Sequence, residues 1–493
     1  MTQFNKQTNT IKTTNHEDAP AYTLSRELEL YTLVVTSNFS NKFYEDNDIR
    51  LERMRKLIAQ TKPEFVAKLA IYAREEMYLR TIPLVLAVEL AKTHNGDNLV
   101  STLVERIVKR ADEITELLGY YALANDRDDV KKLGKLSKQI QKGLSKAFNN
   151  FDEYQFAKYN RSGAITLKDA LFIVHPTAKD ISQQELFNKI AEDTLKTPYT
   201  WETELSEKGN TAEAWIGLID SKKLPYMAAL RNLRNMLNAK VPFAKLNDVV
   251  NYLTNETAIR NSKQFPFRYL SAYKELKGMV SPEVMLLLQG LEDAVKQTAS
   301  NIPMFSPEET VAIACDVSGS MFTYISPKSK VMNYDIGLVL GMLLQNRCSR
   351  VVTSFFGDDN KIVALPKDNI LSNVMELKDR EGEVGYSTNG YKVLDSLRKN
   401  DIKADKIMMF TDCQMWDSHY TTSMVDYWKE YKEFYPDAKL FLFDLDGYGT
   451  TPVQTQDNDS VYLISGWSDR VFNMIAAYER KETAISEIEN IVL

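Results

Sequence analysis

The spacing of apolar residues along this chain changes once, near residue 305, and the change predicts two architectures. Between about residues 21 and 298, apolar positions recur at intervals of three and four, as in the segments 63–77 and 99–122. This is the period of an amphipathic helix, and no convincing alternation of the kind shown by a half-buried strand interrupts it. We therefore expect an array of stacked helix pairs joined by short polar links, without a strict sequence repeat.

After Pro307 the apolar runs become short, and each ends in acidic or turn residues. They read TVAIACD, RVVTSFFGD, DKIMMFTDC, KLFLFDLDG and SVYLISG, and helical patterns separate them. Strands alternating with helices are typical of a parallel sheet covered on both faces. The sequence predicts a multidomain protein with a loose arm at 1–20, an all-α part at 21–305 and a doubly wound, Rossmann-like α/β domain at 306–493.

Composition places the chain among globular proteins and limits its surroundings. Its 493 residues are 44% hydrophobic and 26% charged, so several domains with ordinary cores are expected. No apolar run approaches the roughly 18 residues that span a bilayer, and the polar N-terminus lacks the apolar segment of a secretory signal. Three widely spaced cysteines, Cys315, Cys348 and Cys413, suit core positions in a reducing compartment. We expect a cytoplasmic protein that makes no membrane contact.

The segment AIACDVSGSM places chemistry at the end of the first predicted strand. Asp316, Ser318 and Ser320 alternate, so their side chains point the same way in an extended loop. Thr388 precedes a predicted helix, Asp412 ends the next strand, and ligands of parallel sheets sit beyond such strand ends. Carboxylates and hydroxyls without nitrogen or thiolate favour Mg²⁺, with Mn²⁺ or Ca²⁺ as alternatives. The alternative is that these residues have a structural role only and cap loops and helices.

These five residues resemble the metal-ion-dependent adhesion site of von Willebrand factor type A domains. The resemblance covers about residues 308–493 and implies that Asp316, Ser318, Ser320, Thr388 and Asp412 hold the metal directly or through water. The loop around Thr388 reads Gly385-Tyr386-Ser387-Thr388-Asn389, whereas relatives often have glycines before the threonine and an aspartate after it.

A stripe of lysines concentrates positive charge within a chain of net charge −6. Its members are spaced by three or four residues and share one face of a predicted helix at 131–148: Lys131, Lys135, Lys138, Lys142 and Lys146. Leucine, isoleucine and alanine occupy the opposite face. The segment 131–168 holds nine basic residues against two acidic ones, which suits a phosphate backbone. A solvated amphipathic helix is the alternative.

The segment FAKYNRSGAITLKDALFIVHP adds Lys158, Tyr159, Arg161, Lys168 and His175. Arginine and tyrosine can stack on single-stranded bases, although His175 alone also fits a core or capping role. This segment, with TPYTWETELSEKGN, MAALRNLRNML and FPFRYLSAY, resembles successive blocks of the TROVE module. Their order, followed by a type A domain, is similar to the Ro autoantigen and its bacterial relatives.

This resemblance implies a monomeric ring of HEAT-like repeats closed by the type A domain, and a function in RNA binding. It implies that small non-coding Y RNAs bind the basic outer surface and that single-stranded 3′ ends of misfolded RNA enter the central hole. It implies that Lys158, Arg161, Lys168 and His175 contact RNA. It also implies that a 3′-to-5′ exoribonuclease is a partner in RNA quality control or maturation.

No catalytic constellation competes with this interpretation. The histidines are scattered, no Walker-type glycine loop is present, and no Ser-His-Asp set can be assembled. We expect a protein that is not an enzyme. The alternative function is a protein-interaction scaffold whose metal takes an acidic side chain from a partner, and a metal-dependent hydrolase is disfavoured because the ligand set lacks a general base.

Overall fold

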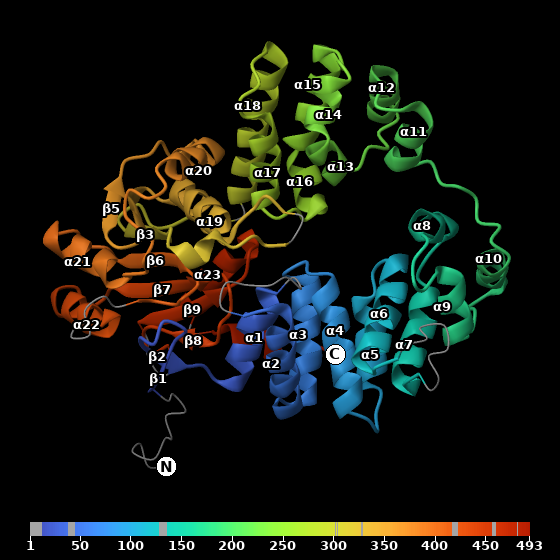
Figure 1. The fold of residues 1–493 in the computed structure, drawn as a ribbon, viewed down its shortest axis with the longest axis horizontal. Helices are drawn as coiled ribbons and strands as arrows, with labels where there is room; N and C mark the ends of the chain where they lie inside the picture. Colours follow the sequence, from blue (N-terminus) through green and yellow to red (C-terminus); the bar gives the residue numbers. More distant parts are fainter. Residues whose placement is uncertain are drawn as a thin grey trace. The chain divides into compact units, whose positions relative to one another are not determined.

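The chain divides into two compact units in a computed structural model, which describes residues 12–37, 45–127, 136–300, 302, 304–326, 329–416, 423–455, 460–480 and 482–493. Unit 1 comprises Met1–Arg50 and Lys208–Ala484, and unit 2 comprises Leu51–Glu207 and Ile485–Leu493. This division differs from the domain boundary expected at residue 305. The helices that follow Lys208, α12 to α18 in Figure 1, belong to the same compact unit as the α/β domain, and so do the described residues before Leu51.

Unit 2 is helical, as the apolar spacing predicts. Its helices are α2 (Asn47–Gln60), α3 (Pro63–Glu75), α4 (Thr81–Thr93), α5 (Leu99–Ile107), α6 (Ala111–Ala124), α7 (Lys138–Phe148), α8 (Glu153–Tyr159), α9 (Leu167–Val174), α10 (Ile181–Ala191) and α11 (Trp201–Lys208). The segment 99–122, whose apolar spacing predicts helix without a break, is divided between α5 and α6. The carboxylate of Glu113 accepts hydrogen bonds from the backbone N–H groups of Lys109 and Arg110, which caps α6 and separates it from α5.

The remaining helices of the all-α part lie in unit 1. They are α12 (Ala212–Asp220), α13 (Tyr226–Arg231), α14 (Leu233–Asn238), α15 (Phe243–Leu253), α16 (Glu256–Ser262), α17 (Phe267–Leu276) and α18 (Pro282–Ala299). A buried hydrogen bond of 2.9 Å between the hydroxyls of Tyr226 and Tyr269 joins α13 to α17. Ser281 caps α18, and Pro282 occupies its first position, where the missing N–H costs nothing.

The α/β domain of unit 1 contains a six-stranded sheet in the order β5-β4-β3-β6-β7-β9. Its strands are β3 (Thr310–Asp316), β4 (Arg350–Phe356), β5 (Asn360–Val363), β6 (Lys406–Thr411), β7 (Lys439–Asp444) and β9 (Val461–Ser465). The five apolar runs form the parallel strands, and β5 is an antiparallel edge strand that the sequence did not predict.

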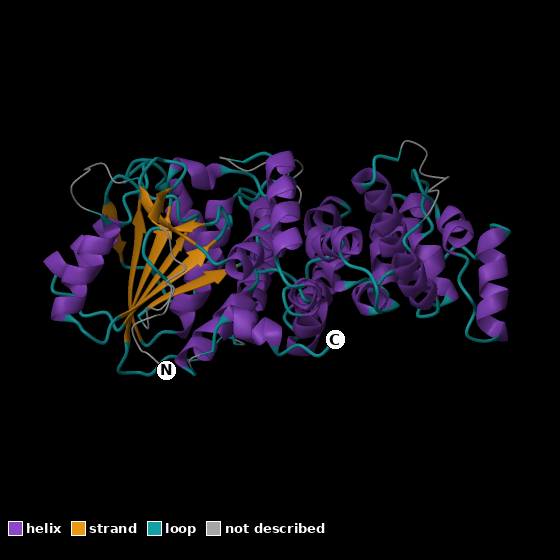
Figure 2. Cartoon of the chain, turned by 90° about the horizontal axis from the view of Figure 1, so that it is seen from below, coloured by secondary structure: helices purple, strands orange, loops and turns teal. Residues whose placement is uncertain are grey.

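Helices cover both faces of this sheet (Figure 2). They are α19 (Asn333–Arg347), α20 (Ile370–Asp379), α21 (Tyr391–Lys399), α22 (Met424–Phe434) and α23 (Asn473–Glu479), with the short helices η1 (Gly319–Phe322) and η2 (Asp469–Phe472). Successive residues of a strand point to opposite faces of the sheet. Ala312 and Ala314 pack in the cluster of α21 and α22, whereas Cys315 meets α19 at Gly341.

The expected loose arm at residues 1–20 is wrong for the residues that the structure describes. Residues from Lys12 onward form β1 (Lys12–Thr14) and β2 (Pro20–Thr23), and α1 (Arg26–Val35) follows. β2 pairs with β8 (Thr450–Thr451), so a strand also occurs within the segment expected to be purely helical. The turn between β1 and β2 is held by a hydrogen bond of 2.6 Å from the Asn15 side chain to the carbonyl of Met415.

The chain ends with α24 (Ala484–Glu489), and residues from Ile485 on belong to unit 2. Lys68 donates a hydrogen bond to the carbonyl of Glu489, and Arg106 donates one to the carbonyl of Val492. Within the described segments, the helices are too short or too polar to cross a membrane. The expected fold class, a helical part followed by a doubly wound α/β domain, is confirmed. Closure of the helices into a ring stays a prediction.

Candidate functional site

The predicted metal ligands lie together at the carboxyl end of the sheet in unit 1. Asp316 is the last residue of β3, Ser318 caps η1, and Asp412 directly follows β6. The Ser318 and Ser320 hydroxyl oxygens are 3.4 Å apart, and Thr388 lines the same cleft as Ser320. All five side chains are buried. The alternation that the sequence predicts is therefore the arrangement that the fold produces.

Backbone hydrogen bonds tie the loops of this cleft to one another. The N–H of Gly319 donates to the carbonyl of Tyr386 at 2.8 Å, and the N–H of Trp416 donates to the carbonyl of Thr388 at 2.8 Å. Gly385 has a φ of +74°, and a Cβ there would lie 2.2 Å from the Asp358 carboxyl, so this position requires glycine.

The cleft has a volume of about 450 Å³. Its lining residues come from the β1–β2 turn, η1, the β4–β5 turn, the loop before α21 and the segment after β6: Glu17, Gly319, Ser320, Asp358, Gly385, Tyr386, Ser387, Thr388 and Trp416. Tyr386 and Trp416 are exposed at this cleft. It is open enough for a small ligand or a partner side chain to reach the hydroxyl groups.

The electrostatics of these carboxylates fit a cation. Burial raises the pKa of Asp316 to about 6, and burial together with the charges of Asp316 and Asp446 raises the pKa of Asp412 well above its usual range. Asp316 accepts hydrogen bonds from Thr411 Oγ1 at 2.6 Å and from the N–H of Ser318 at 2.9 Å. The buried Oδ2 of Asp412 has no hydrogen-bond partner among the described residues.

An unpartnered buried carboxylate oxygen beside two hydroxyls and a second carboxylate is the donor set that a hard divalent ion prefers. No group of three or more His, Cys, Asp or Glu side chains arranged for a metal occurs in the described part of the chain. Any ion at this site would therefore depend on hydroxyl ligands, as the sequence predicts, and the residues present fit Mg²⁺.

Sequence reasoning missed two further buried carboxylates at this end of the sheet. Asp444 ends β7, and its Oδ1 accepts the backbone N–H groups of Asp446 and Gly447. The Asp446 carboxylate accepts a hydrogen bond of 2.7 Å from the Asn333 side chain. The motif DLDG, which also follows a strand, was the signal that could have revealed them.

The lysine stripe is exposed on α7 as far as the structure describes it. Lys131 and Lys135 lie outside the described residues, whereas Lys138, Lys142 and Lys146 are exposed. The opposite face of α7 is buried, as its amphipathic pattern predicts. Lys142 donates to the Asn98 side chain at 2.8 Å, and Lys146 pairs with Glu105 at 2.6 Å. An exposed ion pair of this kind contributes little to stability.

Lys158 and Arg161 lie at a groove of about 310 Å³ beside the end of α8. The Lys158 ammonium is 5.8 Å from the ring centre of Tyr154 and 5.5 Å from that of Tyr159. Arg161 is 3.9 Å from the carboxylate of Glu202, which also lines the groove. The ring contacts hold Lys158 without neutralising its charge.

The groove contains a cation that sequence reasoning missed. Lys196 lines it together with Lys158 and Arg161, and Glu202 is the carboxylate among the described lining residues. The carboxylate of Glu153 also lies near Lys196, whose charge helps to lower the pKa of Glu153. The signal was available, because Lys196 directly precedes the block TPYTWETELSEKGN, and folding brings that block back against α8.

The last two predicted contacts, Lys168 and His175, lie on and after α9. Lys168 pairs with Asp193 at 2.8 Å on the surface. His175 is exposed and ends α9 in the left-handed conformation, with a φ of +50°. It is therefore not a core residue, and it caps the helix through its backbone while its ring faces solvent.

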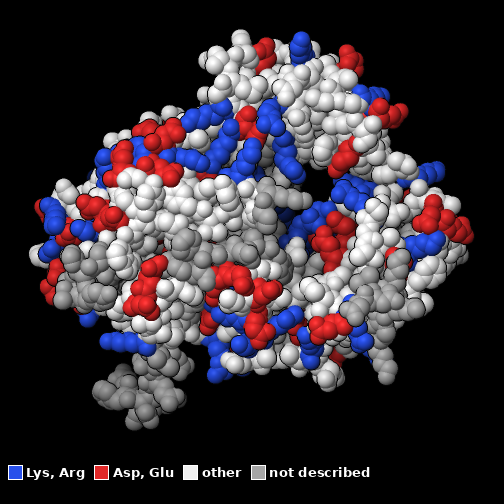
Figure 3. All heavy atoms as spheres, viewed as in Figure 1, with Lys and Arg blue, Asp and Glu red and all other residues white. Residues whose placement is uncertain are grey.

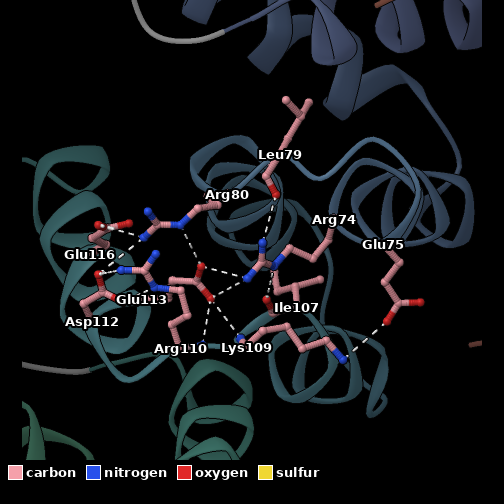
Figure 4. Close-up of polar contacts among 10 residues, drawn as sticks. All are labelled: Arg74, Glu75, Leu79, Arg80, Ile107, Lys109, Arg110, Asp112, Glu113 and Glu116. Carbon is pink, nitrogen blue, oxygen red and sulfur yellow. Dashed lines mark hydrogen bonds and ion pairs between the residues drawn. The ribbon is translucent and has the colours of Figure 1, made fainter. Parts of the chain in front are cut away.

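An ion network is centred on the buried carboxylate of Glu113 at the start of α6 (Figure 4). The carboxylate of Glu113 is fully buried and accepts two hydrogen bonds from Arg74, at 2.8 and 3.0 Å, and one from Arg80 at 3.2 Å. Arg110 pairs with Asp112 at 2.7 Å, and its guanidinium lies 4.3 Å from the ring centre of Tyr159. The network thereby links α3 and α6 to the end of α8, next to Lys158.

Two curated proteins are similar in sequence to part of this chain. Telomerase protein component 1 of Rattus norvegicus is 27% identical over 297 residues, which are 44% of this chain and 11% of that protein. The Mus musculus protein of the same name is 25% identical over 333 residues, which are 51% of this chain and 13% of that protein. The chain therefore matches only a small part of the length of these curated relatives.

The crystal structure of the Deinococcus radiodurans RO (RSR) protein has the same fold. It aligns with 93% of this chain and 100% of that chain, at a TM-score of 0.60 and 15% sequence identity. The sequence itself matches the TROVE domain over residues 21–197 and 192–285, which is more than half of its length. The chain belongs to the TROVE domain family.

Proposed function

We propose that this chain is an RNA-binding protein and that its groove beside α8 holds the backbone of single-stranded RNA. The observation that carries the proposal is the charge of the groove, whose lining includes Lys158, Arg161 and Lys196 against the carboxylate of Glu202, with Glu153 near Lys196 as a second carboxylate. A phosphodiester backbone supplies the missing negative charge. Membership in the TROVE family and the exposed lysines of α7 support the same ligand.

The contacts expected at this groove favour phosphate recognition over base recognition. Lysine and arginine bind phosphate oxygens whatever the sequence, so affinity falls as salt rises and depends little on base identity. Tyr154 is exposed beside Lys158 and offers a ring on which a base can stack. The resemblance to Ro proteins further favours small Y-like RNAs and single-stranded 3′ ends as ligands, and an exoribonuclease as a partner.

The protein acts by binding, without cleaving RNA or hydrolysing nucleotide. The groove holds lysine, arginine and threonine side chains, and Glu202 is the one carboxylate that lines it. His175, the histidine nearest in sequence, lies at the surface end of α9. We expect labelled RNA to remain intact on incubation with the purified protein.

Charge reversal tests the RNA site. Fluorescence anisotropy of a labelled oligouridylate is measured over a range of salt concentrations for the wild type and for Lys158→Glu/Arg161→Glu. If each residue binds one phosphate, the slope of log affinity against log salt changes by about 1.4. The control Lys56→Glu/Lys62→Glu makes the same change of charge at exposed positions on and after α2. An unchanged slope in the groove variant would refute the proposal.

We also propose that the cleft at the carboxyl end of the sheet binds Mg²⁺ through Asp316, Ser318, Ser320, Thr388 and Asp412. The unpartnered Oδ2 of Asp412 supports this. A divalent ion held by these residues would supply a Lewis acid that a partner's carboxylate can bind, which is the alternative function of a metal-dependent scaffold. Chelation separates the two functions, because RNA held in the groove of unit 2 stays bound in EDTA whereas a partner held through the metal dissociates.

A further inference from the structure

Two segments of unit 1 carry positive charge that the proposed groove does not use. Residues 221–247 and 257–274 together contain ten Lys or Arg and no Asp or Glu, in a chain whose net charge is −6. The two segments contain all of α13 and α14 and parts of α15, α16 and α17. Figure 3 shows Lys and Arg side chains gathered over this part of the molecule. These segments include the two family-like blocks MAALRNLRNML and FPFRYLSAY.

Some of this charge is neutralised by acidic residues from elsewhere in unit 1. Arg234 pairs with Glu275, Lys245 pairs with Asp220, and Lys274 pairs with the buried carboxylate of Asp335 at 2.6 Å. The charge of these cations is already neutralised, so only the unpaired cations of the two segments can require a ligand.

Lys222, Lys240 and Arg260 are exposed cations that water can solvate. Arg231 and Arg268 also lack a counter-charge among the described residues, and they differ from those three because the charge of one acts on the other. Arg231 ends α13, and Arg268 is the second residue of α17. The hydrogen bond between Tyr226 and Tyr269 fixes these helices against each other, and Tyr269 directly follows Arg268 in the chain. Among the residues that the structure describes, neither guanidinium has an ion pair or a hydrogen bond to an acceptor, and the Arg268 guanidinium lies 5.1 Å from the ring centre of Phe267.

This arrangement is unfavourable for Arg268 in the absence of a ligand. Burial lowers its pKa, and the neighbouring positive charge of Arg231 lowers it further, with no carboxylate acting in the opposite direction. Arg74, which is buried to a similar degree, accompanies the carboxylate of Glu113 at 2.8 Å. Arg268 is half-buried, whereas Arg231 is exposed. A charge withdrawn from water is normally paired, so Arg268, with a second cation as its neighbour and no anion, indicates that the anion comes from outside the chain.

We propose that Arg231 and Arg268 form a second phosphate-binding site, in unit 1, which holds a phosphodiester of the bound single-stranded RNA. Arginine suits this ligand because its planar guanidinium donates two parallel hydrogen bonds to phosphate oxygens. Two adjacent guanidiniums can share one phosphate, which neutralises their mutual repulsion. The site extends the proposed function and rests on it for the identity of the ligand.

The stability of the unliganded protein provides the first test. Arg268→Met keeps an unbranched side chain and removes the charge, so the thermal midpoint should equal or exceed that of the wild type in phosphate-free buffer. Inorganic phosphate should raise the midpoint of the wild type more than that of Arg268→Met at matched ionic strength. A lower midpoint for Arg268→Met without phosphate, together with an equal phosphate effect in both proteins, would overturn the proposal.

RNA binding provides the second test. With labelled oligouridylate, Arg231→Gln/Arg268→Met should weaken binding roughly tenfold or more, because charge-assisted hydrogen bonds are lost. Arg268→Lys should give an intermediate loss, since it keeps the charge and loses the paired geometry. The matched control is Arg260→Gln, on the exposed side of α16, which should leave affinity unchanged.

The two proposals fail in distinguishable ways. Wild-type affinity in Arg231→Gln/Arg268→Met, with a loss in Lys158→Glu/Arg161→Glu, overturns the second site and leaves the proposed function intact. If the wild type binds no RNA at all, the proposed function fails, and the phosphate-dependent rise in the thermal midpoint still decides whether Arg231 and Arg268 bind an oxyanion.

Discussion

Replacing Glu113 by glutamine should destabilise the protein strongly, because this side chain neutralises a buried arginine. Its carboxylate is fully buried and accepts hydrogen bonds from Arg74, from Arg80 and from the backbone N–H groups of Lys109 and Arg110 (Figure 4). Glu113→Gln keeps the shape and removes the charge. One amide oxygen then serves donors that two carboxylate oxygens served before, and the amide NH₂ group faces other donors.

The size of the effect follows from the environment of Arg74. Its side chain is 10% exposed, so the loss of Glu113 leaves a positive charge largely without water or a counter-charge. Breaking a buried pair in this way costs about 3–5 kcal/mol. At about 2–4 °C per kcal/mol for a domain of this size, the melting temperature should fall by about 6–20 °C.

Chemical and thermal denaturation of the full chain measure this effect. The control Glu116→Gln removes a charge from the same helix, where the carboxylate is 3.7 Å from Arg80 and 42% exposed, and it should cost about 1 kcal/mol or less. If Glu113→Gln changed the free energy of unfolding by no more than this control, the network would not stabilise unit 2 and the reasoning would be wrong.

Three further predictions concern packing, metal and pH. Gly143→Ala should destabilise by about 1–3 kcal/mol in urea titrations, because its Cβ would lie 2.6 Å from the Cβ of Val104, whereas Gly119→Ala, with open space around it, should stabilise slightly. Mg²⁺ should raise the melting temperature of the wild type and leave that of Asp412→Asn unchanged; equal shifts would contradict the metal site. Hydrogen bonding to Arg106 lowers the pKa of Glu75 in the folded protein. The pair therefore stabilises the fold fully at pH values above the pKa of Glu75 in the unfolded chain, and this stabilisation is lost as the pH falls through the lower pKa of the folded state. Glu75→Gln should therefore have a lower free energy of unfolding than the wild type near neutral pH and the same free energy of unfolding in acid, as measured by urea unfolding.

The sequence predicted those features that depend on local periodicity. A run such as TVAIACD can bury both faces only inside a covered sheet, and the alternation of Asp316, Ser318 and Ser320 follows from the geometry of an extended chain. The two faces of α7 were likewise readable, since a helix places every third or fourth residue on one side. These inferences need only the residue order and the shape of the backbone.

The tertiary structure decided whatever depends on partners far away in the chain. β2 is short and partly polar, and it becomes a strand only because β8 offers its edge. The neutralisation of Lys146 by Glu105 and of Lys168 by Asp193 could not be seen in the sequence, nor could the presence of Lys196 in the groove. The same holds for Arg231 and Arg268, whose lack of a counter-charge is a property of the fold. By itself the sequence determined the elements and the kinds of chemistry at their ends. Which charges face one another was decided by the fold, because electrostatic energy depends on distance and burial in space and not on separation along the chain.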